Sequence, residues 1–279
     1  IVQLYDRILN SILRSLNHPK INIRTKALRT VSSLLAQSPD IFSLPQVQKS
    51  LSERIVDVSI QVREASVDIV GKYMVFKPQF AKDFYMVVCD RSSDTGAAVR
   101  KRVIKLLHSI YHIVEDEHIK IEITERIIRR IDDEEKSISE LSTAILTELF
   151  FPPMKSKSAG DMVDEFEQRK TAREIASILL AVWSRGDKNS RFLRDLFLKL
   201  FHPVKGTASP TVKITAKCLI EDLVEQASQY QTLSQAEKIL GLLSDIIGAN
   251  GSFMVQDHLM LLSGFISEES SEAQNCCYY

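Results

Sequence analysis

The chain has 279 residues, equal numbers of basic and acidic side chains (36 each) and 44% hydrophobic residues. This composition is typical of a globular protein and excludes disorder of the whole chain. No apolar run approaches the roughly 20 residues needed to cross a bilayer, and the start lacks the order of a signal peptide. We therefore expect no membrane partner. Because the sequence opens in a helical pattern without Met, we also expect a fragment of a longer protein.

The charge is unevenly distributed along the chain. Residues 1–39 hold six Lys or Arg and one acid, whereas residues 219–279 hold one Lys and nine acids. The first segment can therefore face a polyanion that the last segment repels. The four cysteines have no spacing that predicts a disulfide framework or a zinc site.

The spacing of apolar residues predicts an all-α chain. Apolar residues recur at steps of three and four, and all eight prolines fall between periodic segments, where no helical hydrogen bond is lost. The predicted helices are 1–17, 20–37, 45–56, 58–75, 78–92, 95–113, 117–131, 135–151, 163–185, 189–202, 210–229, 232–248 and 253–266.

The second helix of each predicted pair opens at a recurring position. An aliphatic residue stands there at spacings of 39, 37 and 39, namely Ile23, Val62, Val99 and Ile138. Five residues earlier comes a polar side chain that can cap the next helix: His18, Asp57, Asp94 and Asp133. Helix pairs of this period are typical of HEAT arrays. We predict a HEAT-repeat α-solenoid, a right-handed superhelix of antiparallel helix pairs.

The repeats divide the chain into four predicted parts. Residues 1–151 form four HEAT-type repeats, and residues 152–162 form a linker or mark an omitted loop. Residues 163–266 form further HEAT-type helices, with a fifth recurrence at Val212-Lys213, and residues 267–279 are predicted to be a disordered tail.

The sequence offers little for chemistry. It contains no Gly-x-Gly, no Gly-Lys-Ser/Thr and no Gly-x-Ser-x-Gly, so we expect no nucleotide cofactor and no catalytic residue. His108 and His112 lie four apart on one predicted helix, but no third ligand stands at the usual spacing. We therefore predict a protein that is not an enzyme and holds no metal.

One helix is distinguished by its charge. From Val99 to Ile113 it carries four Lys or Arg and no acid. A helical wheel places Lys101 and Lys105 roughly opposite the apolar face, with Arg102 between. Such point charges can contact phosphates without reading sequence. The predicted nucleic-acid-binding residues are Lys101, Arg102 and Lys105, with Lys26 and Arg29 at equivalent positions of the first repeat.

The alternative is that this basic face is only solvated, because Asp68 interrupts it in the intervening repeat. A second set of charges has a structural interpretation. Arg24, Arg63 and Arg100 lie just inside the second helices, where each can pair with an Asp before it or in the next repeat. With Asp57 and Asp94 they form a predicted structural ladder between repeats.

Two strings of residues carry a family resemblance. Ile60 to Tyr73, Ile-Gln-Val-Arg-Glu-Ala-Ser-Val-Asp-Ile-Val-Gly-Lys-Tyr, is followed by Asp94 to Lys105, Asp-Thr-Gly-Ala-Ala-Val-Arg-Lys-Arg-Val-Ile-Lys. Together they resemble the cohesin loader of the Nipped-B (adherin) family. Arg129 to Glu135 and Leu149 to Pro152 continue the resemblance in register. It covers residues 15–153 and is fainter beyond the linker.

The resemblance implies a function. Members of that family are similar to hook-shaped HEAT proteins that load cohesin on chromosomes in the nucleus, in sister chromatid cohesion. They hold double-stranded DNA against the cohesin heads and kleisin, and they stimulate ATP hydrolysis by those heads. A tetratricopeptide partner would bind a region absent from this chain. The alternative is a HEAT scaffold or adaptor that binds only proteins.

Overall fold

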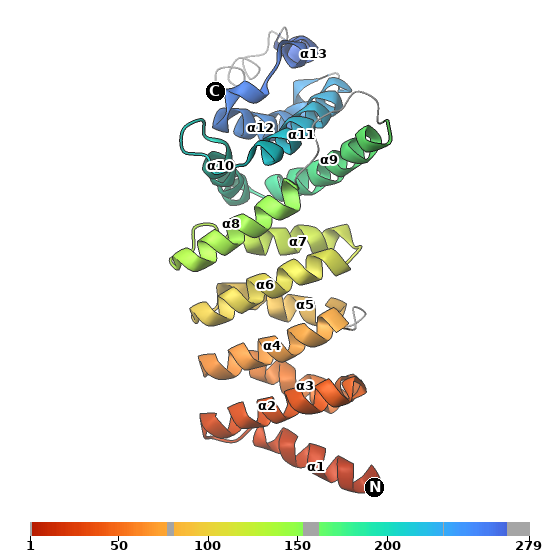
Figure 1. Cartoon of the computed structure of the whole chain (residues 1–279), viewed down its shortest axis with the longest axis vertical. Helices are drawn as coiled ribbons and strands as arrows, with labels where there is room; N and C mark the ends of the chain where they lie inside the picture. The colour runs from red at the N-terminus through yellow and green to blue at the C-terminus, as the bar shows by residue number, and fades with distance from the viewer. Residues whose placement is uncertain (1, 77–80, 153–161, 231, 267–279) are drawn as a thin grey trace. The chain divides into compact units, whose positions relative to one another are not determined.

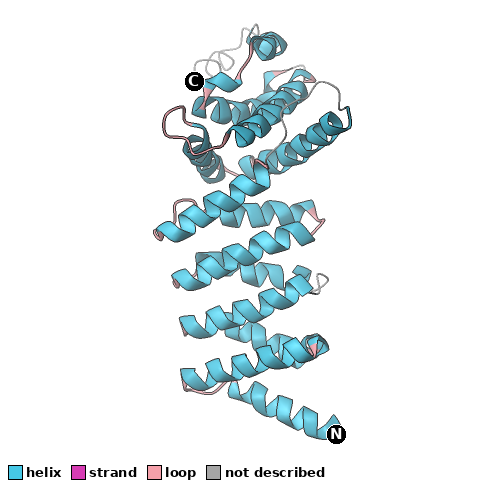
Figure 2. Cartoon of the chain, in the orientation of Figure 1, coloured by secondary structure: helices cyan, strands magenta, loops and turns pink. Residues whose placement is uncertain are grey.

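The computed structural model describes residues 2–76, 81–152, 162–230 and 232–266. Throughout these ranges the regular secondary structure is helical, as Figure 2 shows, which confirms the all-α prediction. The predicted tail, 267–279, lies outside the described residues, as does most of the predicted linker. No helix in the ranges just given is long and apolar enough to span a membrane.

The chain forms two compact units (Figure 1). The first contains residues 1–127 and 134–138, and the second contains residues 128–133 and 139–279. The helices of the first unit are α1 (Val2–Ser15), α2 (Ile21–Gln37), α3 (Pro45–Ile55), α4 (Ile60–Phe76), α5 (Ala81–Asp90), α6 (Ala97–Ile113) and nearly all of α7 (Glu117–Ile128). Short 3-10 turns, η1 (Pro39–Ser43) and η3 (Arg91–Ser93), precede α3 and α6.

In the first unit the helices form two layers. α2, α4 and α6 are successive neighbours in one layer, while α3, α5 and α7 lie behind them (Figure 1). The recurring apolar positions hold the layers together. Val62 and Val99 are buried, and so are Val70 and Leu107, which stand eight residues after them. Burying one such side chain contributes roughly 1.5 to 3 kcal/mol.

A glycine sets the distance between α4 and α6. A Cβ atom at Gly71 would lie 2.7 Å from a methyl group of Leu106. The missing side chain therefore lets the two helices approach closely, and any larger residue would push Leu106 away. This close approach brings the charged faces of α4 and α6 side by side.

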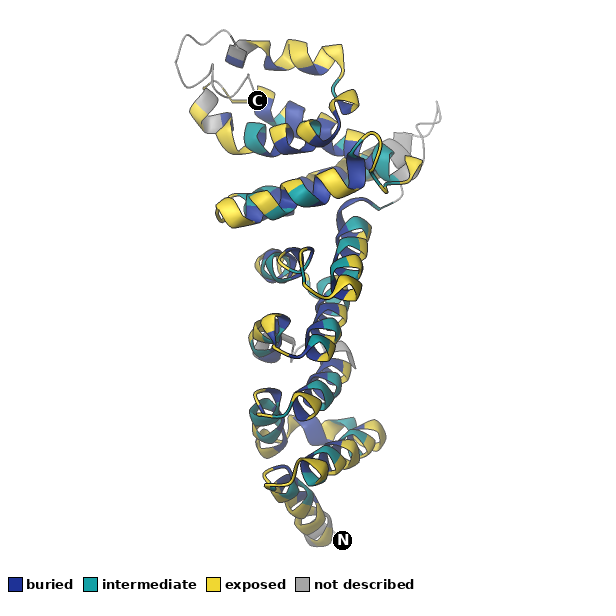
Figure 3. Ribbon diagram, turned by 90° about the vertical axis from the view of Figure 1, so that its left-hand side faces the viewer, coloured by how far each residue is buried: buried dark blue, intermediate teal, exposed yellow. Residues whose placement is uncertain are grey.

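The second unit contains most of α8 (Lys136–Phe150) and five further helices. These are α9 (Met162–Trp183), α10 (Asp187–Phe201), α11 (Pro210–Ser228), α12 (Leu233–Ala249) and α13 (Gln256–Ile266), with a 3-10 turn η4 (Gly251–Phe253). α11 packs against α9, α12 and α13, and α10 packs against α12. Each helix carries buried and exposed stripes (Figure 3).

Aromatic rings fill the core of the second unit. Phe151 and Phe201 meet edge to face with centroids 5.0 Å apart, and Phe253 meets Phe201 at 5.2 Å. Trp183 lies against α12, where a Cβ atom at Gly241 would be 2.5 Å from its ring. Its indole N–H donates to Asp245 at 2.9 Å.

The predicted helices correspond to the observed ones to within a few residues at most boundaries. Two predicted helix ends are wrong by two or three residues. The helix predicted to end at residue 92 stops at Asp90, where the 3-10 turn Arg91–Ser93 follows, and the helix predicted from residue 253 begins at Gln256, after the 3-10 turn Gly251–Phe253. The fold class, a HEAT-type helical array, is confirmed.

Candidate nucleic-acid interface

The basic helix α6 presents one buried and one charged face. Its apolar side chains, Val99, Val103, Ile104, Leu106, Leu107 and Ile110, are all buried. Arg102 and Lys105 are exposed, and Lys101 is half-buried. The structure therefore places the three predicted phosphate-binding residues together on the accessible side of one helix.

Arg102 is engaged by acids of the neighbouring helix. Its guanidinium lies 2.9 Å from Asp68 and 3.9 Å from Glu64, both on α4. Asp68 also forms an ion pair with Lys72, one turn along α4, at 2.8 Å. The two acids thus neutralise part of the positive charge that the sequence places on this surface.

The other predicted cations are not neutralised in this way. Within the described ranges, Lys101 and Lys105 on α6, and Lys26 and Arg29 on α2, have no ion-pair partner. Lys26 and Arg29 are exposed. Their helix, α2, belongs to the same layer as α6, but α4 and its acids lie between the two helices. The structure therefore brings the α6 cations together and separates them from the α2 cations.

Two histidines extend the polar face of α6. His108 is half-buried and His112 exposed, and their Nε2 atoms are 3.1 Å apart. The rings meet edge to face with centroids 4.8 Å apart. They lie one and two turns beyond Lys105, so the polar face continues towards the end of the helix.

The ladder residues lie at the turns between paired helices. Arg24 donates to Asp57 at 2.8 Å. Arg63 makes two parallel hydrogen bonds to Asp94, from Nε at 2.8 Å and from Nη2 at 2.6 Å. Each bond joins one repeat to the next. Arg100 donates to Glu134 at 3.1 Å, a pairing that was not among the predicted ladder contacts.

Each ladder arginine also binds the main chain of its own turn. Nη1 of Arg24 donates to the carbonyl oxygen of His18 at 2.9 Å, and Nη1 of Arg63 to that of Asp57 at 2.8 Å. Nη1 of Arg100 donates to the carbonyl oxygen of Asp94 at 2.9 Å. In all three cases the acceptor lies six residues before the arginine, so the side chain closes the turn that precedes its helix.

The aspartates organise the same turns. Asp57 accepts from the backbone N–H of Ser59 at 2.9 Å, and Asp94 from that of Gly96 at 2.8 Å. Burial would raise the pKa of Asp94, but the hydrogen bonds from Arg63 and Gly96 outweigh it and lower that pKa below its ordinary value. Asp94 therefore stays ionised inside the fold.

A further set of arginines was missed by the sequence analysis. Arg54 lies 3.1 Å from Asp57 and Arg91 lies 3.6 Å from Asp94, each three residues before its acid. In the second unit, Arg130 pairs with Asp133 in the same way at 3.3 Å. The spacing Arg-x-x-Asp recurs at the same place in three repeats, and this signal was available in the sequence.

Comparison with known proteins identifies the family. The model described as "Sister chromatid cohesion protein PDS5 protein" matches residues 3–205, which include α2, α4 and α6. The chain belongs to this family of sister chromatid cohesion proteins. Its relatives include the human "Nipped-B-like protein", 32% identical over 230 residues, which are 82% of this chain and 8% of the relative. The Nipped-B resemblance is confirmed.

A yeast relative and a solved structure match nearly the whole chain, in sequence and in fold respectively. "Sister chromatid cohesion protein 2" of Saccharomyces cerevisiae is 27% identical over 289 residues, covering 98% of this chain and 18% of the relative. The structure of "Chaetomium thermophilum cohesin loader SCC2, C-terminal fragment" has a TM-score of 0.77 at 20% identity, covering 98% of this chain and 20% of that one. The chain thus spans less than a fifth of the length of each curated relative named here.

Proposed function

We propose that this chain is part of a cohesin loader. It is a non-catalytic HEAT scaffold that binds DNA and cohesin, promotes cohesin loading on nuclear chromosomes and stimulates the ATPase of the cohesin heads. Membership of the sister chromatid cohesion family and the Nipped-B relatives support this proposal. Since the sequence lacks a phosphate-binding loop, stimulation acts through contact with the heads and not through nucleotide bound here.

The observation that carries the DNA part of the proposal is the accessible face of α6. Lys101 and Lys105 present ammonium groups that no acid within the described ranges neutralises. Cations on a rigid helix can contact successive phosphates, which gives affinity without sequence preference. Arg102 contributes less because binding a phosphate would require it to leave Asp68.

The α2 cations make a smaller contribution to DNA binding. Glu64 and Asp68 stand between Lys26 or Arg29 and the α6 face, and their charges repel a phosphate backbone that crosses α4. The cohesin heads and the kleisin are the protein partners. The tetratricopeptide partner of the loader binds a part of the protein outside this chain.

The test is a titration of the folded chain with a fluorescent duplex DNA at low salt. Replacing Lys101, Arg102 and Lys105 together by Glu should weaken binding about tenfold or more, because contacts are lost and repulsion is added. The matched control replaces three exposed cations elsewhere, Lys49, Lys188 and Arg191, by Glu and changes the net charge equally. Equal weakening by the two triple variants would reject α6 as the DNA surface.

A scaffold that binds only proteins is the second candidate. It is favoured by the Asp68 and Glu64 pairs with Arg102 and by the zero net charge of the chain. It predicts that the unaltered chain captures cohesin subunits, that nuclease does not reduce capture, and that the α6 triple variant captures them equally well.

A further inference from the structure

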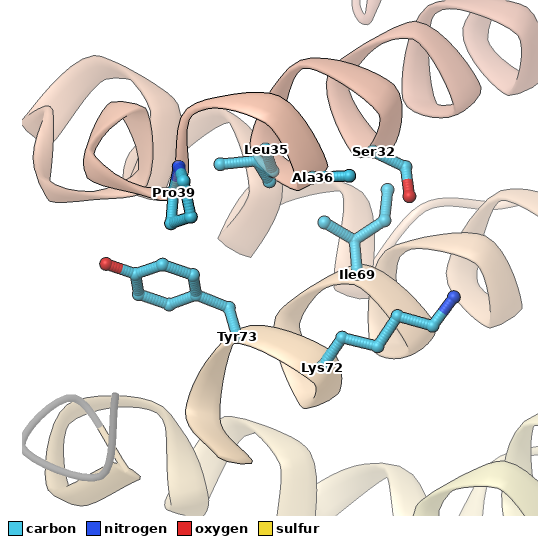
Figure 4. A pocket seen from close by; sticks show the side chains of 7 residues that line it. All are labelled: Ser32, Leu35, Ala36, Pro39, Ile69, Lys72 and Tyr73. Atoms are coloured by element: carbon cyan, nitrogen blue, oxygen red, sulfur yellow. The ribbon is translucent and has the colours of Figure 1, made fainter. Parts of the chain in front are cut away.

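A pocket opens between α2 and α4 in the first unit (Figure 4). Its volume is about 290 Å³, and it is lined by Ser32, Leu35, Ala36, Pro39, Ile69, Lys72 and Tyr73. Most of the lining is apolar, and its polar side-chain groups are the hydroxyls of Ser32 and Tyr73 and the ammonium of Lys72. This size is near the lower end of natural ligand pockets and suits one large or two small apolar side chains.

The walls of the pocket are fixed by packing. Tyr73 stacks on Phe42 with centroids 3.6 Å apart and planes within 18° of parallel. Phe42 in turn meets Phe84 edge to face at 5.4 Å. Leu35 and Ile69 are buried on the opposite helices. The aromatic wall is therefore held in place before any ligand arrives, which reduces the entropy lost on binding.

Three cations lie on the side of the pocket formed by α2 and α4. Lys72 is exposed at its rim, and its ion pair with Asp68 leaves the rest of the ammonium accessible. Residues 26, 29, 33 and 36 follow one another on a single face of α2, so Lys26 and Arg29 lie on the side of the helix where Ala36 borders the pocket. Within the described ranges these two cations have no ion-pair partner.

We propose that this pocket binds an apolar side chain from an acidic peptide segment of a protein partner. The apolar floor excludes water from a leucine or phenylalanine, while the cations beside it attract flanking carboxylates. A DNA backbone presents phosphates and sugars, which gain nothing from an apolar floor. The inference deepens the proposed scaffold function, and rests on it, by giving the chemistry of one protein contact.

The experiment uses fluorescence polarisation with the whole chain. The probe is a short fluorescein-labelled peptide in which a Leu-Phe pair is flanked by Glu and Asp, and the control peptide has Ser-Ser in place of that pair. Ala36→Phe fills the mouth of the pocket from an exposed position, and Gln37→Phe adds the same ring next to it, outside the lining. Circular dichroism and urea midpoints establish that both variants fold.

We expect the Leu-Phe peptide to bind about tenfold more tightly than the Ser-Ser peptide, since the pocket removes one large apolar side chain of the pair from water. Ala36→Phe should remove that difference and Gln37→Phe should keep it. Lys72→Gln should weaken binding and its salt dependence, whereas Lys49→Gln on α3 should change neither.

Equal binding of the two peptides, no binding of either, or an unchanged affinity in Ala36→Phe would overturn the inference. DNA titrations separate this inference from the proposed DNA surface: Ala36→Phe should leave DNA affinity unchanged. Loss of DNA affinity on altering α6 should leave peptide binding intact.

Discussion

Both units contain Arg–Asp ion pairs with a buried acid, but the arginine is buried in the ladder of the first unit and exposed in two pairs of the second. In the first unit the arginines of the ladder are buried, with side chains 7% exposed for Arg24 and 9% for Arg63. In the second unit the acids Asp222 and Asp245 are buried, but their partners Arg173 and Arg194 are 61% and 59% exposed. A buried acid therefore does not by itself make its arginine partner part of the buried structure.

The surroundings of the arginine account for the difference. Each ladder arginine meets an acid of the next repeat and carbonyl oxygens of its own turn, so most of its donors are satisfied inside the protein. Arg194 has the carboxylate of Asp245, which also accepts from Trp183, while the rest of its guanidinium faces water. The first arrangement stabilises repeat stacking, whereas the second adds a surface contact to an acid already held.

The largest expected effect is that of Arg63→Ala. It would leave Asp94 buried without its main partner and the carbonyl of Asp57 without its donor. Breaking a buried pair from one side costs about 3 to 5 kcal/mol. Urea denaturation followed by circular dichroism should show this loss in the unfolding free energy. Arg173→Ala, at a half-solvated pair, should cost about 1 kcal/mol or less.

Equal losses in these two variants would break the comparison between the units. A loss below about 1 kcal/mol in Arg63→Ala would show that the ladder does not stabilise the first unit. Arg24→Ala provides an independent rung of the same ladder, since Arg24 pairs with Asp57 and binds the carbonyl of His18. It should be destabilising in the same range.

In the second unit the acid should matter more than the arginine. Asp245→Ala removes the acceptor of the Trp183 indole N–H and of Arg194. A half-buried donor left without a partner costs about 1 to 3 kcal/mol. Arg194→Ala should cost less than Asp245→Ala in the same denaturation assay, and the reverse order would contradict the stated role of Asp245.

The pH dependence should report on Asp94. Its pKa is lowered in the folded chain, so the stability it contributes is present above its ordinary pKa of about 3.9. That stability is lost as the pH falls through the lowered value. The urea midpoint should therefore decrease on acidification below about pH 4. In Asp94→Asn the urea midpoint should decrease less steeply with acidification. An equally steep decrease in this variant would contradict the assignment of the effect to Asp94.

The smallest effect is expected at the ion pair between Arg100 and Glu134. Glu134, which forms an ion pair with Arg100, is 83% exposed. Glu134→Gln should change the unfolding free energy by about 0 to 1 kcal/mol, as for other surface pairs. A larger loss of unfolding free energy, measured in parallel with Arg63→Ala, would show that an ion pair of the ladder is not weakened by exposure of one partner.

The sequence was sufficient for the helices, because burial in each layer requires apolar residues at steps of three and four. It also singled out Arg24, Arg63 and Asp94, which the structure brings into hydrogen-bond contact. The carbonyl acceptors could not be predicted, since they depend on the path of the turn and not on residue type.

The pairing of Arg102 was also missed. In the sequence, Asp68 is only a gap in the basic face, because a helical wheel treats each helix separately. Gly71, which brings α4 close to α6, makes Asp68 a partner of Arg102. Contacts between layers of a repeat array therefore require the spacing of the helices as well as their faces.

The most direct test of the proposed DNA surface is the salt dependence of DNA binding by the unaltered chain and by the Lys101, Arg102 and Lys105 triple Glu variant. Each phosphate contact contributes about −0.9 to the slope of log affinity against log salt. We expect the slope to become shallower by about 2 to 3 in the triple variant, with no change in the Lys49, Lys188 and Arg191 control. Identical slopes in all three proteins would contradict DNA binding through α6.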